Sequence, residues 1–202
     1  MGKRTQQAKI LRVFRKVHRT TGALLFIFFF FISVTGLLLG WKKNTNGVIL
    51  PKTQKGTTAE LKNWLPVDSL HTIACTTLHN FVSPDLSLEL DRIDMRKQKG
   101  SVKFIFVDNY YEVQLDGATG EVLSIGQRKS DFLENVHDGS ILDRYLNTDG
   151  YIKLSYTTIM GVSLLLFTVT GFWLWYGPKQ MRKSGKAKPD KLPKQPNYQH
   201  LN

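Results

Sequence analysis

The chain has a single cysteine, Cys75, among 202 residues. One cysteine excludes an internal disulfide framework, which an oxidising compartment would otherwise favour in a small domain. We therefore expect Cys75 to be a small, buried apolar residue. Catalytic patterns are lacking as well, because no nucleophile–base pair, phosphate loop, paired carboxylates or zinc-protease motif is present. No reaction class follows from the motifs.

Charged side chains are missing from two long apolar runs, one between Arg19 and Lys42 and the other between Lys153 and Lys179. As helices these runs would extend about 33 and 37 Å, and a bilayer has a hydrocarbon core of about 30 Å. Aromatic residues at their ends are typical of a membrane interface: Trp41, Trp173, Trp175 and Tyr176. We predict two transmembrane helices, over residues 20–41 and 153–177.

A cleaved signal peptide is the alternative for the first run, because a basic stretch precedes it. However, the run is longer than the roughly 7–15 apolar residues of a signal peptide, and no small-x-small cleavage site follows it. We expect the first run to be retained as a membrane span.

Acidic residues are scarce at both ends, and this explains most of the net charge of +12. Residues 1–19 carry seven Lys or Arg and no acid, and residues 179–202 carry seven against Asp190 alone. The positive-inside rule therefore predicts cytoplasmic ends (1–19 and 178–202) and an exported segment, 42–152. The basic ends are expected to lie against lipid headgroups, and the C-terminal tail to be disordered. Nucleic acid is not expected, because no basic folded surface is indicated.

The exported segment is long enough for one small domain. It begins with a turn-rich lead-out over residues 43–56. Asp68 can cap a helix whose core face would hold Leu70, Ile73, Leu78 and Phe81. From Asp91 onward apolar residues alternate, with turns at residues 98–100, 108–109 and 116–120. These patterns predict an α+β domain, with three or four antiparallel strands packed on the helix.

Several motifs resemble known families. The stretch from Tyr111 to Leu123, with its Asp-Gly-Ala-Thr-Gly-Glu turn at Asp116, resembles the closing hairpin of a PepSY domain, and we expect Asp116 to bond its own turn backbone. Four further motifs are similar to the PepSY-associated transmembrane family: Val17-His18-Arg19-Thr20-Thr21-Gly22, Val34-Thr35-Gly36-Leu37, Val136-His137-Asp138-Gly139 and Val169-Thr170-Gly171-Phe172-Trp173. This resemblance implies two transmembrane helices flanking a PepSY-like domain, in the inner membrane of a bacterium.

The two spans run in opposite directions and form a weak inverted repeat. His18 and Thr170-Gly171 are therefore expected toward the cytoplasmic side, and His137 and Thr35-Gly36 toward the outside. Small residues lie on the helical face of His18, and this stripe has two readings: close helix packing, or a surface for a flat cofactor. The glycines assigned to helix packing are Gly22, Gly36, Gly40, Gly161 and Gly171.

Some larger members of this family resemble ferric-siderophore reductases, which move electrons across a membrane through haems held by histidines. By that resemblance His18 and His137 are candidate axial ligands of haem b, and no other metal is expected. Two spans supply one histidine at each interface instead of a pair, so a homodimer or a partner membrane subunit is expected to complete the site. On residue type alone, the alternative to ligation is at least as well supported for each histidine: His18 would face the lipid headgroups, and His137 would be a polar loop residue. No role is assigned to His71, His79 or His200.

Two functions remain as hypotheses. The first is a small transmembrane redox protein or subunit that passes electrons toward an external ferric chelate. The second is a non-catalytic anchor whose exported PepSY-like domain binds or restrains a peptidase or another envelope partner. Under the second hypothesis the histidines are incidental and the glycines only pack helices.

Overall fold

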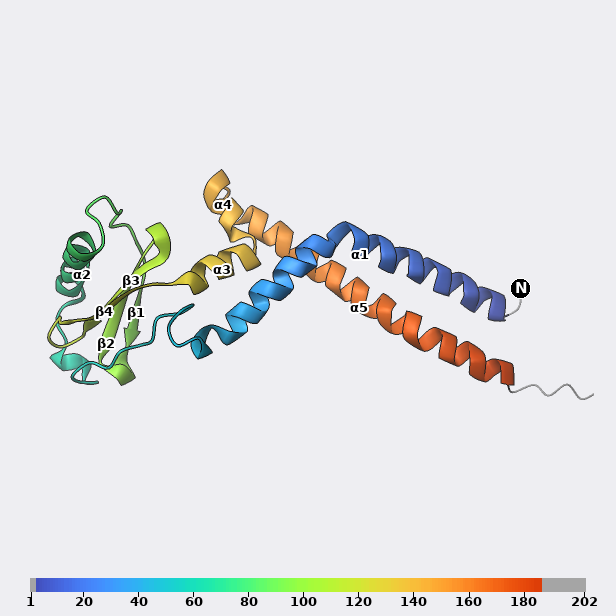
Figure 1. Ribbon diagram of the computed structural model, residues 1–202, viewed down its shortest axis with the longest axis horizontal. Helices are drawn as coiled ribbons and strands as arrows, with labels where there is room; N and C mark the ends of the chain where they lie inside the picture. Colours follow the sequence, from blue (N-terminus) through green and yellow to red (C-terminus); the bar gives the residue numbers. More distant parts are fainter. Residues whose placement is uncertain (1–2, 187–202) are drawn as a thin grey trace, which may run out of the picture. The chain divides into compact units, whose positions relative to one another are not determined.

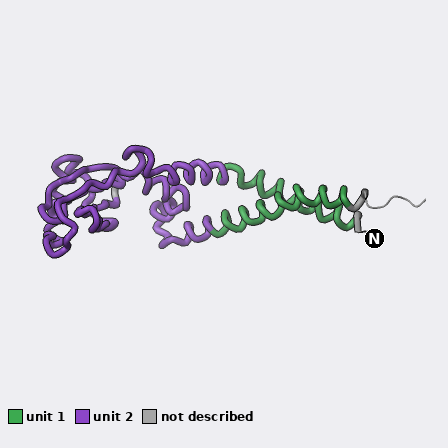
Figure 2. The backbone as a smooth tube through the Cα atoms, turned by 90° about the horizontal axis from the view of Figure 1, so that it is seen from below, with its two compact units in different colours: residues 1–28, 158–202 green, residues 29–157 purple. Residues whose placement is uncertain are grey.

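The computed structural model describes residues 3–186, and it divides into two compact units (Figures 1 and 2). Unit 1 consists of residues 1–28 and 158–202, and unit 2 of residues 29–157. Two long helices, α1 (Lys3–Trp41) and α5 (Tyr151–Lys186), contribute to both units. The C-terminal tail expected to be disordered lies, from residue 187 on, outside the described residues.

The helices α1 and α5 are long and apolar enough to cross a membrane, over Thr5–Asn44 and Tyr151–Lys183. Their apolar side chains are largely uncovered: Leu24 is 74% exposed, Phe26 63% and Leu165 65%. Such a surface would be unfavourable in water, because each buried CH₂ group is worth about 0.8 kcal/mol. The two helices thus present long apolar surfaces that the described part of the chain leaves uncovered.

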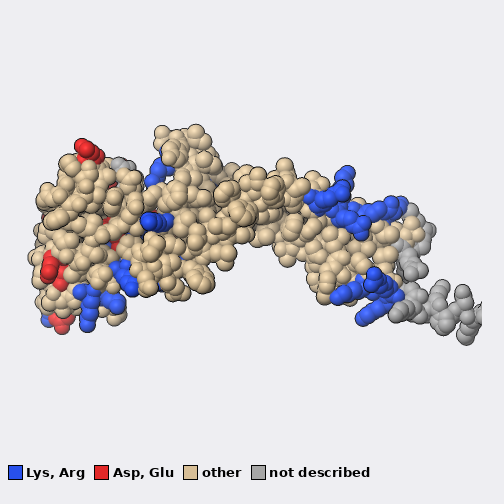
Figure 3. Space-filling view, viewed as in Figure 1, with Lys and Arg blue, Asp and Glu red and all other residues tan. Residues whose placement is uncertain are grey.

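Within unit 1, the two helices approach each other closely through small residues. A Cβ atom added at Gly177 would lie 2.7 Å from Cδ2 of Leu11, and the rings of Phe14 and Trp173 are 6.1 Å apart. Lys and Arg side chains gather on the N-terminal part of α1 and the C-terminal part of α5, where Figure 3 shows no acidic side chain. Unit 1 thus combines an apolar surface with a basic end.

Unit 2 contains the predicted antiparallel meander, with strand order β1-β2-β3-β4 (Figure 1). The strands are β1 (Leu90–Arg96), β2 (Ser101–Phe106), β3 (Tyr111–Asp116) and β4 (Val122–Gln127). The short helices η3 (Lys97–Lys99) and η4 (Asp108–Tyr110) join the first three strands. At the last turn, Asp116 Oδ1 accepts hydrogen bonds from the backbone N–H groups of Ala118 (2.8 Å) and Thr119 (3.3 Å). The predicted turn chemistry is therefore confirmed.

The core lies between the sheet and α2 (Val67–Phe81), where Leu70 and Leu78 pack against the apolar face of β2 and β3. Two expectations for this helix are wrong. Pro66, not Asp68, is the N-cap residue, and Asp68 lies inside the first turn. Phe81 is 76% exposed, because the helix ends there and Val82 contacts the core instead.

Cys75 is half-buried rather than fully buried, so that expectation is only partly met. It packs against the core, and its Sγ lies 3.3 Å from Nε2 of His71. Burial raises the pKa of the Cys75 thiol. This is the environment of an unreactive structural cysteine.

On β2 and β3 the other face of the sheet is largely polar and yet buried, which the alternating pattern did not indicate. The segment from Val48 to Thr57 covers it: Gln54 N–H donates to Gln114 Oε1 (2.9 Å), and Gln114 Nε2 donates to the Lys52 carbonyl (2.9 Å). The residues expected to be only a lead-out, together with η1 (Lys42–Asn44) and η2 (Leu61–Asn63), thus connect the span to the domain. The buried polar residues of this face are Ser101, Lys103, Glu112, Gln114 and Asp116.

A buried ion network lies on this polar face. Glu112 is completely buried and pairs with Lys103 Nζ (3.3 Å) and Arg128 Nη1 (2.7 Å). Burial lowers the pKa of Lys103, although the Glu112 carboxylate opposes that effect. Arg128 leads into α3 (Lys129–His137) and α4 (Ser140–Leu146), two short helices that periodicity did not predict. They connect the sheet to α5.

Candidate functional site

Each candidate histidine contacts the Thr-Gly pair of the other half of the inverted repeat. We call the contacts in unit 1 the His18 cluster and those in unit 2 the His137 cluster. The His18 cluster consists of His18, Phe167, Thr170 and Gly171. The His137 cluster consists of Thr35, Gly36 and His137.

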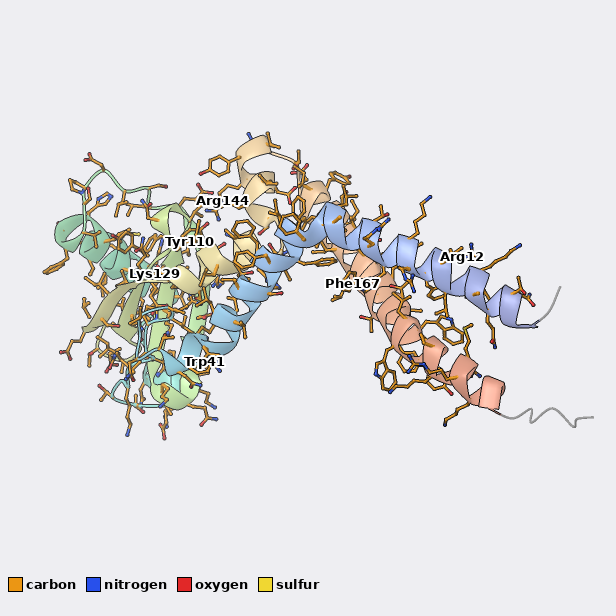
Figure 4. The ribbon with its side chains drawn as sticks, turned by 45° about the vertical axis from the view of Figure 1, so that its right-hand side comes forward. Arg12, Trp41, Tyr110, Lys129, Arg144 and Phe167 are labelled. Atoms are coloured by element: carbon orange, nitrogen blue, oxygen red, sulfur yellow. The ribbon has the colours of Figure 1, made fainter. Side chains whose placement is uncertain are left out.

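In the His18 cluster, Nδ1 of His18 lies 2.9 Å from Oγ1 of Thr170. The imidazole stacks on the ring of Phe167 with a centroid distance of 3.8 Å (Phe167 is labelled in Figure 4). A Cβ atom added at Gly171 would meet His18 Cε1 at 3.4 Å, so glycine lets the imidazole lie close to the backbone of α5. A Cβ atom added at Gly22 would lie 3.0 Å from Cε2 of Phe167, so this glycine lets the Phe167 ring lie close to the backbone of α1.

The His137 cluster repeats these distances on other elements. His137 is the last residue of α3, and its Nδ1 lies 2.9 Å from Oγ1 of Thr35 in α1. A Cβ atom added at Gly36 would meet His137 Cε1 at 3.4 Å, as at Gly171. Thr35 and Thr170 are 6% and 5% exposed, although most of the apolar side chains on their helices are exposed. The inverted repeat of the sequence is therefore also a repeat of side-chain contacts.

Each threonine hydroxyl lies within hydrogen-bond distance of both a helix carbonyl and a histidine. Thr170 Oγ1 lies 2.7 Å from the Leu166 carbonyl oxygen, and Thr35 Oγ1 lies 2.6 Å from the Phe31 carbonyl oxygen. When the hydroxyl proton is donated to the carbonyl, the hydroxyl accepts from the histidine and Nδ1 carries the ring proton. In the neutral ring the lone pair then lies on Nε2, and among residues 3–186 no hydrogen-bond partner is found for Nε2 of either histidine.

The motif around His137 fixes the position of that histidine. Asp138 forms an ion pair with Lys153 at the start of α5 (2.6 Å), and its Oδ1 accepts a hydrogen bond from the Ser140 backbone. Burial raises the pKa of Asp138, but these bonds outweigh it and hold the pKa below its usual value. Gly139 has φ +79°, and a Cβ atom there would lie 2.9 Å from the ring of Tyr156. The motif is thus held between α1 and α5.

The remaining predicted residues do not join these clusters. A Cβ atom added at Gly40 or Gly161 would have no atom within 4 Å, so their packing role stays a prediction that needs a partner outside the chain. In the α+β domain His71 stacks on Phe104, and His79 Nε2 lies 3.2 Å from the Leu86 carbonyl. No group of three or more histidine, cysteine or carboxylate side chains that would hold a metal ion occurs within residues 3–186.

These contacts were only partly visible in the sequence. The motifs and the antiparallel spans indicated which histidine lies on the same side as which Thr-Gly pair. The hydrogen bonds, the stacking on Phe167 and the helix α3 that carries His137 were not predicted. The signal for Phe167 was its spacing of three residues before Thr170, which places both side chains on one face of a helix.

Comparison with known proteins identifies the family. A family model described as the PepSY-associated TM region matches residues 15–195. This chain belongs to that family. The resemblance of the four motifs is thereby confirmed, and the chain is a PepSY-associated membrane protein. Neither the curated proteins nor the solved structures include a match.

Proposed function

We propose that this PepSY-associated protein spans the membrane twice, with both chain ends in the cytoplasm and the α+β domain on the outer face. The basic side chains at the ends of α1 and α5 support this orientation, because Lys and Arg are retained on the cytoplasmic side. In intact cells, a membrane-impermeant maleimide should label Asn80→Cys in α2 and not Lys183→Cys in α5, both made in a Cys75→Ala background. The reverse labelling would contradict this topology.

We further propose that the His18 and His137 clusters hold haem b, and that the protein passes electrons through the membrane toward an external ferric chelate. One observation carries this proposal: Nδ1 of each histidine lies 2.9 Å from the hydroxyl of a buried threonine, and an Nδ1–H that donates to this hydroxyl leaves the lone pair on Nε2. A neutral imidazole held in this way is the form that ligates a metal, because the second hydrogen bond fixes the ring and raises the basicity of the ligand.

The described residues supply one candidate axial histidine in each unit, His18 in unit 1 and His137 in unit 2. Thr170 and Thr35 orient the two rings, and Gly171 and Gly36 let the rings lie against the helix backbone. When bound, haem iron supplies one-electron chemistry, and a histidine ligand helps to set its potential. His18 is the only histidine in the described part of unit 1. A second copy of the chain, docked through open surfaces such as those at Gly40 and Gly161, would supply the matching ligand.

The experiment is a reduced-minus-oxidised absorbance spectrum of the purified full chain, with haem quantified per chain. We expect a b-type spectrum at a reproducible stoichiometry, with loss of the signal in His18→Ala and His137→Ala. The matched control is His79→Ala, which removes a histidine of the soluble domain and should leave the spectrum unchanged. A colourless, folded protein after expression with added haem would contradict haem binding.

A second function is favoured by a different observation. The contacts of His18 with Phe167 and Gly171 are also good helix-packing contacts, and they require no cofactor. In that case the chain is a membrane anchor whose exported domain binds or restrains a peptidase or another envelope protein. A folded apo protein whose His18→Ala variant is merely less stable would support this function over electron transfer.

A further inference from the structure

A cavity of about 420 Å³ lies in unit 2, and no residue of the His137 cluster is among those that line it. It is formed by η4, α3 and α4, and its lining includes Tyr110, Lys129, Phe132, Arg144 and Tyr145. Figure 4 labels Arg144, Tyr110 and Lys129, which lie between α4 and the sheet. Volumes of about 300–1,000 Å³ are typical of small-molecule sites. The lining combines two cations with three aromatic rings.

Neither cation of this cavity forms an ion pair with a carboxylate whose side chain the structure describes. Arg144 instead contacts Tyr110, with Nη1 3.3 Å from the phenol oxygen and the guanidinium 5.1 Å from the ring centre. The nearby carboxylates are engaged elsewhere. Asp131 accepts from Arg92 and Arg128, and Asp143 accepts from Thr148 and two backbone N–H groups at the start of α5. An anion in the cavity would therefore meet two cations that are not paired with these carboxylates.

The wall of the cavity is held in a strained conformation. Asn109 and Tyr110 have φ +54° and +57°, a region that non-glycine residues rarely adopt. Several hydrogen bonds hold them there: Asn135 Nδ2 donates to the Tyr110 hydroxyl (3.1 Å), and Gln127 Nε2 donates to the Asn109 carbonyl (2.9 Å). Backbone strain of this kind gathers at binding sites, where the surrounding contacts maintain it.

The helix that carries Arg144 also exposes large apolar side chains. Leu142 is 48% exposed, Leu146 61% and Tyr145 79%. Leu142, Tyr145 and Leu146 are spaced three and four residues apart, so they share one face of α4. The helix ends at Leu146, and α5 begins at Tyr151, which is 72% exposed. A short helix with an apolar face and a basic side chain, next to a span, is suited to the membrane interface.

We propose that this cavity binds the phosphate of an anionic phospholipid headgroup, with Lys129 and Arg144 on the phosphate and Leu142 and Leu146 beside the acyl chains. An arginine fork and a lysine ammonium are both suited to phosphate oxygens. Phosphatidylglycerol fits better than a zwitterionic lipid, because no carboxylate of the described lining is available for a headgroup ammonium. The proposal rests on the proposed membrane topology, but not on haem.

The test is photocrosslinking of the full chain in bilayer discs that contain phosphatidylcholine, phosphatidylethanolamine and phosphatidylglycerol in equal amounts. Benzoylphenylalanine replaces Phe132, and mass spectrometry identifies the attached lipid. We expect phosphatidylglycerol to be enriched on the order of tenfold, since each basic residue near a membrane surface adds about a several-fold preference for anionic lipid. The same photoreactive group at the exposed Thr76 of α2 measures the background.

Substitution then assigns the signal to the two cations. Lys129→Ala with Arg144→Ala should reduce the phosphatidylglycerol crosslink to background, whereas Arg144→Lys should retain it. The matched control removes two exposed lysines of η3, Lys97→Ala with Lys99→Ala, and should leave the crosslink unchanged. Equal crosslinking of all three lipids, or a crosslink that survives the double substitution at Lys129 and Arg144, would overturn the proposal.

Excess inorganic phosphate at matched ionic strength distinguishes a lipid from a soluble ligand. A retained crosslink supports the lipid headgroup, and its loss would show that the cavity takes free phosphate and would overturn the lipid assignment. Failure of the proposed topology would be seen separately in the thiol labelling of Asn80→Cys. Failure of haem binding would be seen in the absorbance spectrum, which this experiment does not use.

Discussion

The imidazole Nδ1 of His18 lies 2.9 Å from Oγ1 of Thr170, a residue 152 positions later in the chain. When Thr170 donates its proton to the Leu166 carbonyl, it accepts from His18. The histidine is therefore held by one ring nitrogen, and the other carries the lone pair. The same relationship joins His137 and Thr35.

Replacing Thr170 by valine keeps the shape of the side chain and removes the acceptor for Nδ1–H. We expect Thr170→Val to retain the fold and to weaken haem affinity by about 10–100-fold, the usual effect of losing a residue that orients a metal ligand. The measurement is a haem titration of the apo protein. Thr168→Val is the control, because Thr168 bonds the Leu164 carbonyl in the same way and does not contact His18. Equal affinities in both variants would contradict the orienting role.

The glycines of the spans should differ in their tolerance of a methyl group. Gly22→Ala brings Cβ to 3.0 Å from the Phe167 ring, so we expect a loss of about 1 kcal/mol or more in stability. Gly161→Ala meets no atom of its own chain within 4 Å, so it should lower the melting temperature less than Gly22→Ala does. Thermal unfolding in mild detergent compares the two variants.

The open surface at Gly161 also tests the proposed homodimer. Gly161→Leu should leave the monomer folded and lower the dimer fraction, because a bulky side chain would separate packed helices. Native mass spectrometry from lipid discs measures that fraction. A monomeric, folded wild-type chain would contradict the dimer.

Glu112 should be the most sensitive charged residue of the soluble domain. Glu112→Gln leaves Lys103 and Arg128 without their shared buried counter-charge, and breaking a buried pair in this way costs about 3–5 kcal/mol. Hydrogen exchange of the β2 and β3 amides, measured by mass spectrometry, should be faster in this variant because the domain is less stable. Glu121→Gln makes the same change at an exposed turn residue and should retain full protection. Unchanged exchange in Glu112→Gln would show that water reaches the network.

Acid should destabilise the domain through Asp116. Burial raises the pKa of this carboxyl, but hydrogen bonds from Thr57, Ala118 and Thr119 outweigh burial and hold the pKa below its usual value. Because the folded-state pKa is the lower one, the stabilisation is complete above the unfolded-state pKa of about 3.9 and is lost as the pH falls through the folded-state value. Thermal unfolding between about pH 2 and pH 5 measures this slope. Asp116→Asn should flatten it, whereas the exposed Asp68→Asn should not.

The two long apolar helices and the meander were predictable from the sequence. These features follow from local rules, because hydropathy, alternation and turn residues each act over a few positions. The helix ends were less predictable. Asp68 has the residue type of a cap, but Leu65 N–H bonds the Gly117 carbonyl and the helix starts after Pro66.

The polar face of the sheet and the basic cavity depend on contacts between distant segments. Glu112 and Gln114 alternate with apolar residues as they would in a solvated strand, and only the hydrogen bonds to Lys52 and Gln54 show that this face is covered. Likewise, nothing near Arg144 in the chain indicates Tyr110 or Lys129 as neighbours. Such relationships come from packing, which no short pattern encodes.

The most direct test of electron transfer uses sealed vesicles that contain the haem-loaded protein, with ascorbate inside and ferricyanide outside. We predict that ferricyanide is reduced faster than in vesicles without protein, and that His18→Ala and His137→Ala each return the rate to that background. Haem-loaded wild-type protein that gives no more than the background rate would contradict the proposed function.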